Sequence, residues 1–216
     1  STSSGSFTLR TANAGAGASD GVSGSLSMKT GKGEAGSSGS IVLASESSVG
    51  GAGGSIILSV GSGDSGAGGR VIMTSGQSAT ASGGAVSMIT GSSESTSSGA
   101  FSISSGHAAN SGISGGLSLK SGIASSGTSG SILLRTGDST GAGTGGSLSV
   151  QVGSGISGDG GRIVVAGGKS FDRYGGSVSL STGESTIRSS GSFSVRTQDA
   201  GVSGRSGSLS FSSGTA

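Results

Sequence analysis

The sequence contains no cysteine, proline or tryptophan, and only one tyrosine, one histidine and five phenylalanines. The absence of cysteine excludes disulfides and thiolate metal sites, but it leaves the compartment open because extracellular proteins need not use disulfides. No run of 18 apolar residues occurs, so no membrane span is predicted. The first residue is Ser, and no signal-peptide pattern follows it. We therefore expect a chain that is processed, or that is part of a longer array.

Charged residues are also scarce. Twelve Lys and Arg and ten Asp and Glu give a net charge of +2, and they alternate without blocks of one sign. The pI of about 9.4 therefore reflects a small imbalance on a weakly charged chain. A nucleic-acid interface needs a basic stripe with stacking aromatic side chains, and neither is present. The sequence predicts no nucleic-acid partner.

Glycine is abundant, with 50 of 216 residues, and alone this composition is typical of disorder. The apolar residues are ordered, however, in the pattern G-x-φ-x-φ, where φ is apolar. The pattern occurs fourteen times, and both apolar positions are filled each time. The first φ residues are Phe7, Leu26, Ile41, Ile56, Val71, Val86, Phe101, Leu117, Ile132, Leu148, Ile163, Val178, Phe193 and Leu209. After one interval of 19 residues, their spacing is always 15 or 16.

Each φ-x-φ segment has the period of two that is typical of a half-buried strand. One such strand per unit is too short to be stable alone, but identical units can stack. The pattern predicts an all-β fold, a single parallel β-solenoid of about fourteen coils with 15–16 residues per coil. It would be one continuous repeat domain over residues 1–216, with the apolar pairs forming two inner ladders.

Two further positions follow the same repeat. The residue seven after the first φ is always Ala, Gly or Ser, as at Ser78 and Gly155, and this predicts a thin strand facing the apolar pair. Gly precedes each first φ by two residues, and in eleven units Gly also follows it by five. These glycines are predicted corners, where a positive φ angle or a close backbone approach is needed. Ala12, Glu46 and Gln198 interrupt the second series, so those corners should differ locally.

The units resemble the parallel β-solenoid (β-helix) repeat families. The residues that carry the resemblance are G-x-φ-x-φ-x-[ST]-G units such as Gly84–Gly91 and Gly176–Gly183. They look most like the Ser/Gly-rich repeats of large secreted or cell-surface proteins of algae and their relatives. The resemblance implies an extended extracellular protein, and it implies no catalytic residues.

Candidate sites are weak. Matches to GxGxxG, as at Gly31–Gly36, lack the following helix of a dinucleotide site and arise from periodic glycine. The aspartates do not recur at one repeat position, as a calcium ladder requires. His107 has no companion ligands. We therefore predict no catalytic, cofactor-binding or metal residues and no cofactor. The segment from Lys169 to Tyr174 is either a loop packed on itself or a contact patch.

Two functions fit this pattern. The first is a non-catalytic structural rod of an extracellular fibre, sheath or adhesive surface protein, which associates end to end or with other repeat segments. The second is ice binding through a flat face. The residues between each φ pair are mostly Ser with aliphatic interruptions, such as Val42 and Ile57, whereas an ice face favours a regular Thr ladder. The first function is therefore preferred, and contact with a surface, a polysaccharide or ice is left open.

Overall fold

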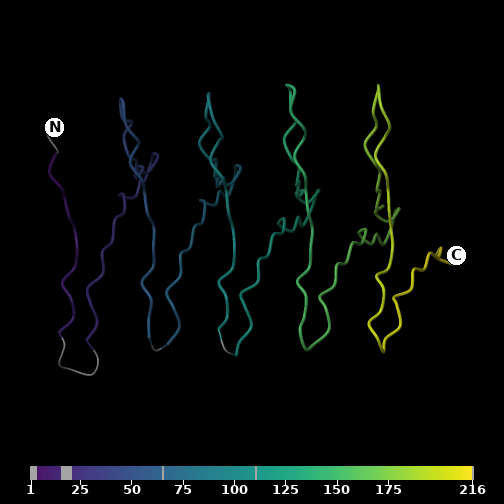
Figure 1. Ribbon diagram of the computed structural model, residues 1–216. Helices are drawn as coiled ribbons and strands as arrows, with labels where there is room; N and C mark the ends of the chain where they lie inside the picture. The colour runs from purple at the N-terminus through teal and green to yellow at the C-terminus, as the bar shows by residue number, and fades with distance from the viewer. Residues whose placement is uncertain (1–3, 16–20, 65, 110, 216) are drawn as a thin grey trace. The chain divides into compact units, whose positions relative to one another are not determined.

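The computed structural model describes residues 4–15, 21–64, 66–109 and 111–215. Over these residues it contains no helix and no strand, and the ribbon in Figure 1 shows neither. The chain divides into two units, Ser1–Ile103 and Ser104–Ala216, which are built from the same repeating pattern. No helix within the described ranges is long and apolar enough to cross a membrane.

The predicted β-solenoid is therefore wrong, and so is the likeness to the β-helix families as a statement about fold. A solenoid requires hydrogen bonds between equivalent residues 15 or 16 positions apart. The backbone hydrogen bonds found instead join residues at most eight positions apart, such as Gly84 N–H to Gly76 C=O at 2.9 Å. A loop of eight residues costs less closure entropy than a coil of fifteen, by about 0.5 kcal/mol, so local closure has a small advantage.

Each repeat unit consists of a seven-residue spacer followed by a closed loop. The spacer starts at the Gly that precedes the first φ by two residues, which we call the conserved Gly because it recurs in all fourteen repeats. It contains the φ-x-φ segment and ends four residues after the first φ. The spacers are residues 5–11, 24–30, 39–45, 54–60, 69–75, 84–90, 99–105, 115–121, 130–136, 146–152, 161–167, 176–182, 191–197 and 207–213. The loops between them have 12 residues in the first unit and eight or nine in the others. All variation in repeat length therefore lies in the loops.

The loop closes where the last residue of one spacer meets the first Gly of the next, a contact that we call the neck. A Cβ placed on that Gly would lie within 4 Å of the facing spacer end in every unit. The thirteen necks are Thr11–Gly24, Thr30–Gly39, Ser45–Gly54, Val60–Gly69, Ser75–Gly84, Thr90–Gly99, Ser105–Gly115, Ser121–Gly130, Thr136–Gly146, Val152–Gly161, Gly167–Gly176, Thr182–Gly191 and Thr197–Gly207. The predicted solenoid corners at these glycines are therefore wrong: each Gly instead lies at a neck, where most of the facing atoms belong to the side chain at the end of the preceding spacer.

Hydrogen bonds of two kinds are found at eight of the necks. In four units the conserved Gly donates its N–H to the carbonyl oxygen of the Gly that lies five residues after the preceding first φ. Gly99 N–H, for example, donates to Gly91 C=O at 2.9 Å. In four others a hydroxyl at the spacer end donates to the carbonyl of the conserved Gly, as in Thr30 to Gly39 at 3.2 Å. The two glycine series predicted as separate corners are therefore partners across one neck.

The small residue seven after the first φ lies inside the loop and does not face the apolar pair. The Ser78 hydroxyl accepts a hydrogen bond from Ala81 N–H at 2.9 Å, and Ser185 accepts one from Arg188 N–H at 2.8 Å. Where this residue is Gly155, a Cβ would lie 2.9 Å from the carbonyl oxygen of Gly158. The position is small because the loop backbone turns back on it, so the predicted thin strand is wrong.

No described residue is buried, and there is no hydrophobic core. The accessible surface is 21720 Å², whereas a compact protein of 19.8 kDa exposes about 8,600 Å². The first φ residues other than Phe7 are 50–64% exposed, and the predicted inner ladders are therefore open to solvent. The physical reason is that each spacer presents its apolar pair without a second layer packed over it.

Candidate functional site

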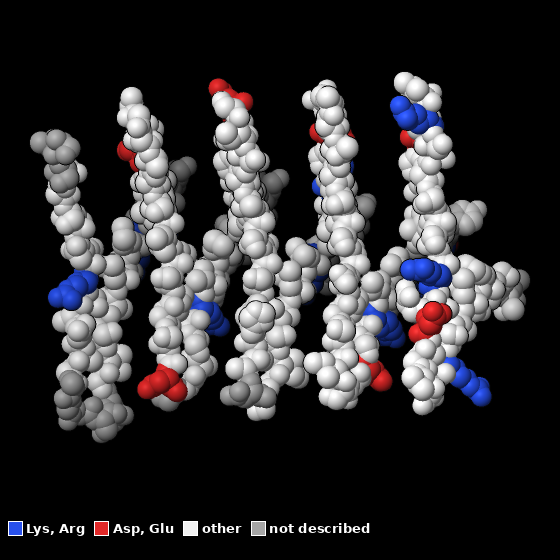
Figure 2. All heavy atoms as spheres, in the orientation of Figure 1, with Lys and Arg blue, Asp and Glu red and all other residues white. Residues whose placement is uncertain are grey.

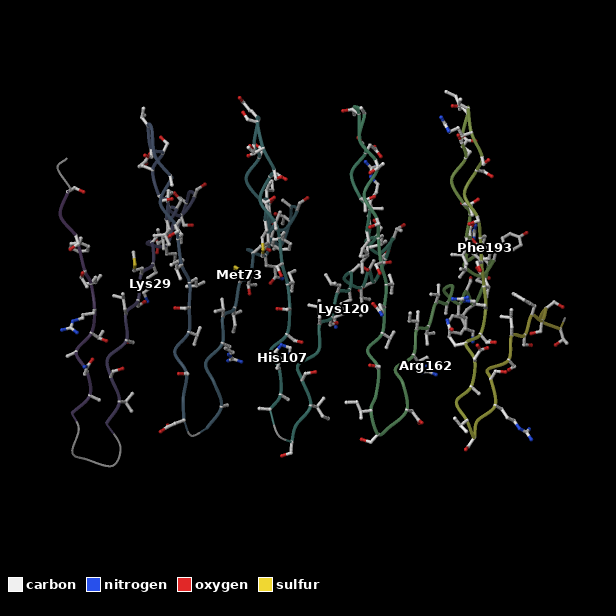
Figure 3. The ribbon with its side chains drawn as sticks, viewed as in Figure 1. Lys29, Met73, His107, Lys120, Arg162 and Phe193 are labelled. Atoms are coloured by element: carbon white, nitrogen blue, oxygen red, sulfur yellow. The ribbon has the colours of Figure 1, made fainter. Side chains whose placement is uncertain are left out.

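The exposed apolar pairs of the spacers are the most regular chemical feature of the molecule. Met73, for example, is the second residue of its pair and is 64% exposed, and Figure 3 shows it on an extended stretch of the trace. In five spacers the residue between the pair is aliphatic as well, and in Val42 and Ile57 it is more than four-fifths exposed. Single exposed apolar residues are common on proteins, but repeated exposed groups mark interaction surfaces.

The necks hold both ends of each spacer. A spacer begins at one neck and ends at the next, six residues later, so its extended length is the same in every complete unit. Val60 and Val152 stand at the spacer end in two units, and they are the least exposed of the large apolar side chains, at 47% and 39%. The necks therefore fix the interval over which each apolar pair is presented.

The single histidine does not belong to a cluster of potential metal ligands among the described residues. His107 is exposed, and Figure 3 shows it on the open trace. Within the part of the chain that the structure describes, no three His, Cys, Asp or Glu side chains gather as metal ligands would.

A shallow, open hollow lies at one neck and is lined by Gln151, Val152, Gly153 and Ser154. These four consecutive residues supply no pair of convergent charged groups. The predicted corner motifs Gly31–Gly36 and Gly153–Gly158 belong to loops and have no helix after them. A phosphate site of the dinucleotide or Walker kind therefore lacks the helix N-terminus that it requires.

The segment from Lys169 to Tyr174 forms a self-contained loop. The Lys169 ammonium lies 4.6 Å from the centre of the Phe171 ring, and the Ser170 hydroxyl accepts a hydrogen bond from Arg173 N–H at 2.9 Å. Phe171 and Tyr174 nevertheless remain more than nine-tenths exposed. The loop therefore packs partly on itself, as one of the two alternatives predicted, and still presents two aromatic rings.

Charge is spread thinly over the surface. Figure 2 shows acidic and basic groups as separate spots on a largely uncharged surface. Arg135 and Asp138 form an exposed ion pair at 3.6 Å, three residues apart in sequence. Such a pair contributes at most about 1 kcal/mol to stability because both groups are well solvated.

Comparison with known proteins gives no relative: no protein-family model, curated protein or solved structure matches the chain.

Proposed function

We propose that the chain is a non-catalytic structural repeat segment of an extracellular fibre, sheath or adhesive surface protein, and that it works by associating with other copies or repeat segments. The observation that carries the proposal is the apolar pair, which recurs in fourteen spacers and is exposed in all of them. Burial of apolar area is the main driving force of association, at about 25 cal/mol per Å².

The repeat favours assembly over the binding of one small ligand. Every spacer presents an apolar side chain at the same two positions of its seven residues, so a partner that contacts one spacer can also contact the next. A small-molecule site would instead be a single concave pocket with a few convergent polar groups. The extracellular location is part of the proposal, and antibody labelling of intact cells tests it.

The association is tested by replacing the four isoleucines at the first φ position, Ile41, Ile56, Ile132 and Ile163, with Ser. The matched control replaces the same four with Leu, which keeps the apolar area. Sedimentation velocity should show concentration-dependent assembly of the wild-type chain and of the Leu variant, and a clear loss with the Ser variant. A wild-type chain that sediments as a monomer up to millimolar concentration would contradict the proposal.

The ice-binding alternative predicts a different result. An ice-binding chain would change the shape of growing ice crystals as a monomer, and its activity would depend on the residues between the apolar pair. An ice-growth assay on the same preparations therefore separates the two functions.

A further inference from the structure

Positive and negative charges occupy different parts of the repeat. Seven of the twelve basic residues lie in spacers: Arg10, Lys29, Arg70, Lys120, Arg135, Arg162 and Arg196. None of the ten acidic residues lies in a spacer. Nine of them lie in nine of the loops, one in each: Glu34, Glu46, Asp64, Glu94, Asp138, Asp159, Asp172, Glu184 and Asp199; the tenth, Asp20, falls between the first two spacers of the sequence and lies outside the described residues.

The resulting charge of the two parts is opposite. The spacers carry +7 and no acidic group, while the loops carry ten acidic and five basic residues, which gives −5; the sum is the net +2 of the chain. All five basic loop residues share their loop with an acidic residue.

The spacers combine their charge with the exposed apolar pair, and several loops combine theirs with an exposed apolar side chain. Glu46 shares a loop with Val49, and Asp159 shares one with Ile156; both aliphatic side chains are fully exposed. All seven basic spacer residues are exposed as well. The two surfaces are thus complementary in charge and alike in apolar character.

One ion pair shows that the two charged positions can meet. Arg135 at the end of a spacer reaches Asp138 in the loop that follows, at 3.6 Å, and both side chains stay more than two-thirds exposed. The same groups on two different chains would be able to pair in the same way, with the apolar groups beside them excluding water from the contact.

We propose that the acidic loops of one copy of this chain dock on the basic, apolar spacers of a second copy. This inference rests on the proposed self-association and names the surfaces that meet. The contact is heterologous, because spacer and loop are different surfaces. A heterologous contact that does not close into a ring continues into an open assembly. Complementary charge also sets the register and rejects like-charged juxtapositions.

The test uses two variants. In the first, the seven basic spacer residues are changed to Glu, which makes spacers and loops both acidic. In the second, the same seven changes are combined with seven loop changes to Lys, at Glu34, Glu46, Glu94, Asp138, Asp159, Glu184 and Asp199. The seven changes of −2 and seven of +2 cancel, so the second variant keeps the wild-type net charge of +2 while its charge placement is reversed.

The wild-type chain should assemble in 0.15 M NaCl and less readily in 1 M NaCl, where the screening length falls from about 8 to about 3 Å. The first variant should need at least about tenfold more protein to assemble. The second should assemble with itself about as readily as the wild type. Fluorescently labelled second variant should not sediment with unlabelled wild-type assemblies, because like charges would then face each other.

The failures of the two proposals are distinct. A wild-type chain that remains monomeric contradicts the proposed self-association, and if it instead sediments with polyglutamate, an acidic polymer replaces the second copy as the occupant of the spacers. If the wild type assembles and the first variant assembles equally readily, the loop-to-spacer pairing is overturned while the self-association itself stands. Free mixing of the second variant with wild type overturns it too, since charge placement would then have no effect.

Discussion

Gly122 and Gly127 belong to the same eight-residue loop, and a Cβ would have open space at both. They differ in backbone conformation, because Gly127 has a φ angle of +116° and Gly122 lies outside the left-handed region. At the residue scale, the abundant glycine of this chain therefore serves unlike purposes. Some positions need the conformation, some need the space at a neck, and some need neither.

Gly127→Ala should distort its loop, whereas Gly122→Ala should leave it unchanged. An L residue forced into the left-handed region loses about 1–2 kcal/mol, which reduces the population of the native loop by a factor of about 5–30. Amide chemical shifts of residues 123–129 measure this change. Equal shift changes for both variants would show that the φ angle of Gly127 is not required.

Gly155 and Gly158 provide a second pair, in which space differs. A Cβ on Gly155 would lie 2.9 Å from the Gly158 carbonyl oxygen, while a Cβ on Gly158 would meet nothing within 4 Å. Gly155→Ala should therefore open the loop and shift the amide resonances of Gly158 and Asp159. Gly158→Ala should change its own amide resonance and leave the other loop resonances nearly unchanged. A silent Gly155→Ala variant would contradict the tight turn described for this position.

The neck is the unit of order at the scale of the element. The Thr136 hydroxyl donates to the Gly146 carbonyl at 3.3 Å, whereas the Thr182–Gly191 neck is closed by the backbone bond from Gly191 N–H to Gly183 C=O at 3.0 Å. The same residue type thus contributes its hydroxyl in one neck and is not needed for the hydrogen bond in the other.

Thr136→Val should loosen its neck, and Thr182→Val should not. Valine keeps the shape of the side chain and removes only the donor, and a net hydrogen bond contributes about 0.5–1.5 kcal/mol, less where water competes. The expected change is a shift of the Gly146 carbonyl carbon resonance toward its value in a short peptide. The Gly191 resonance in the Thr182 variant is the control, and a comparable shift there would contradict the two kinds of neck.

At this scale the sequence predicts the repeat but not its conformation. The glycines at Gly39, Gly54 and their equivalents do lie against another part of the chain, although the facing atoms at these two belong to the side chains of Thr30 and Ser45, and the units of 15 or 16 residues are real. The partner of each conserved Gly is wrong, because periodicity alone does not distinguish closure within a unit from pairing between units. The small residue at Ser78 or Gly155 was equally ambiguous, since a tight loop and a narrow interior both exclude large side chains.

At the scale of the whole molecule, the decisive observation is the large solvent-exposed area. A chain with 21720 Å² of accessible surface and no buried described residue gains little from hydrophobic burial on its own. Alternating apolar patterns predict a buried face only where a second layer exists to cover it. Here the apolar residues recur at regular intervals along the sequence, but the intervals do not indicate which molecule covers these side chains.

A dilute, monomeric preparation should therefore be less compact than a globular protein of equal length. A compact chain of 216 residues has a radius of gyration of about 17 Å. Small-angle X-ray scattering extrapolated to zero concentration should give a clearly larger value, and the value should rise with concentration as copies associate. A concentration-independent radius near 17 Å would indicate a buried core.

Amide hydrogen exchange across the spacers, measured by mass spectrometry on dilute and on assembled protein, shows whether the apolar pairs are covered within one chain or by a second copy. In the monomer, we expect spacer amides such as those of residues 54–60 to exchange at nearly the rate of an unstructured peptide, because their apolar pairs are uncovered. In the assembly the same amides should be protected, because a second copy then excludes water. Strong spacer protection in the dilute monomer would contradict the account, since it would require a covering layer within one chain.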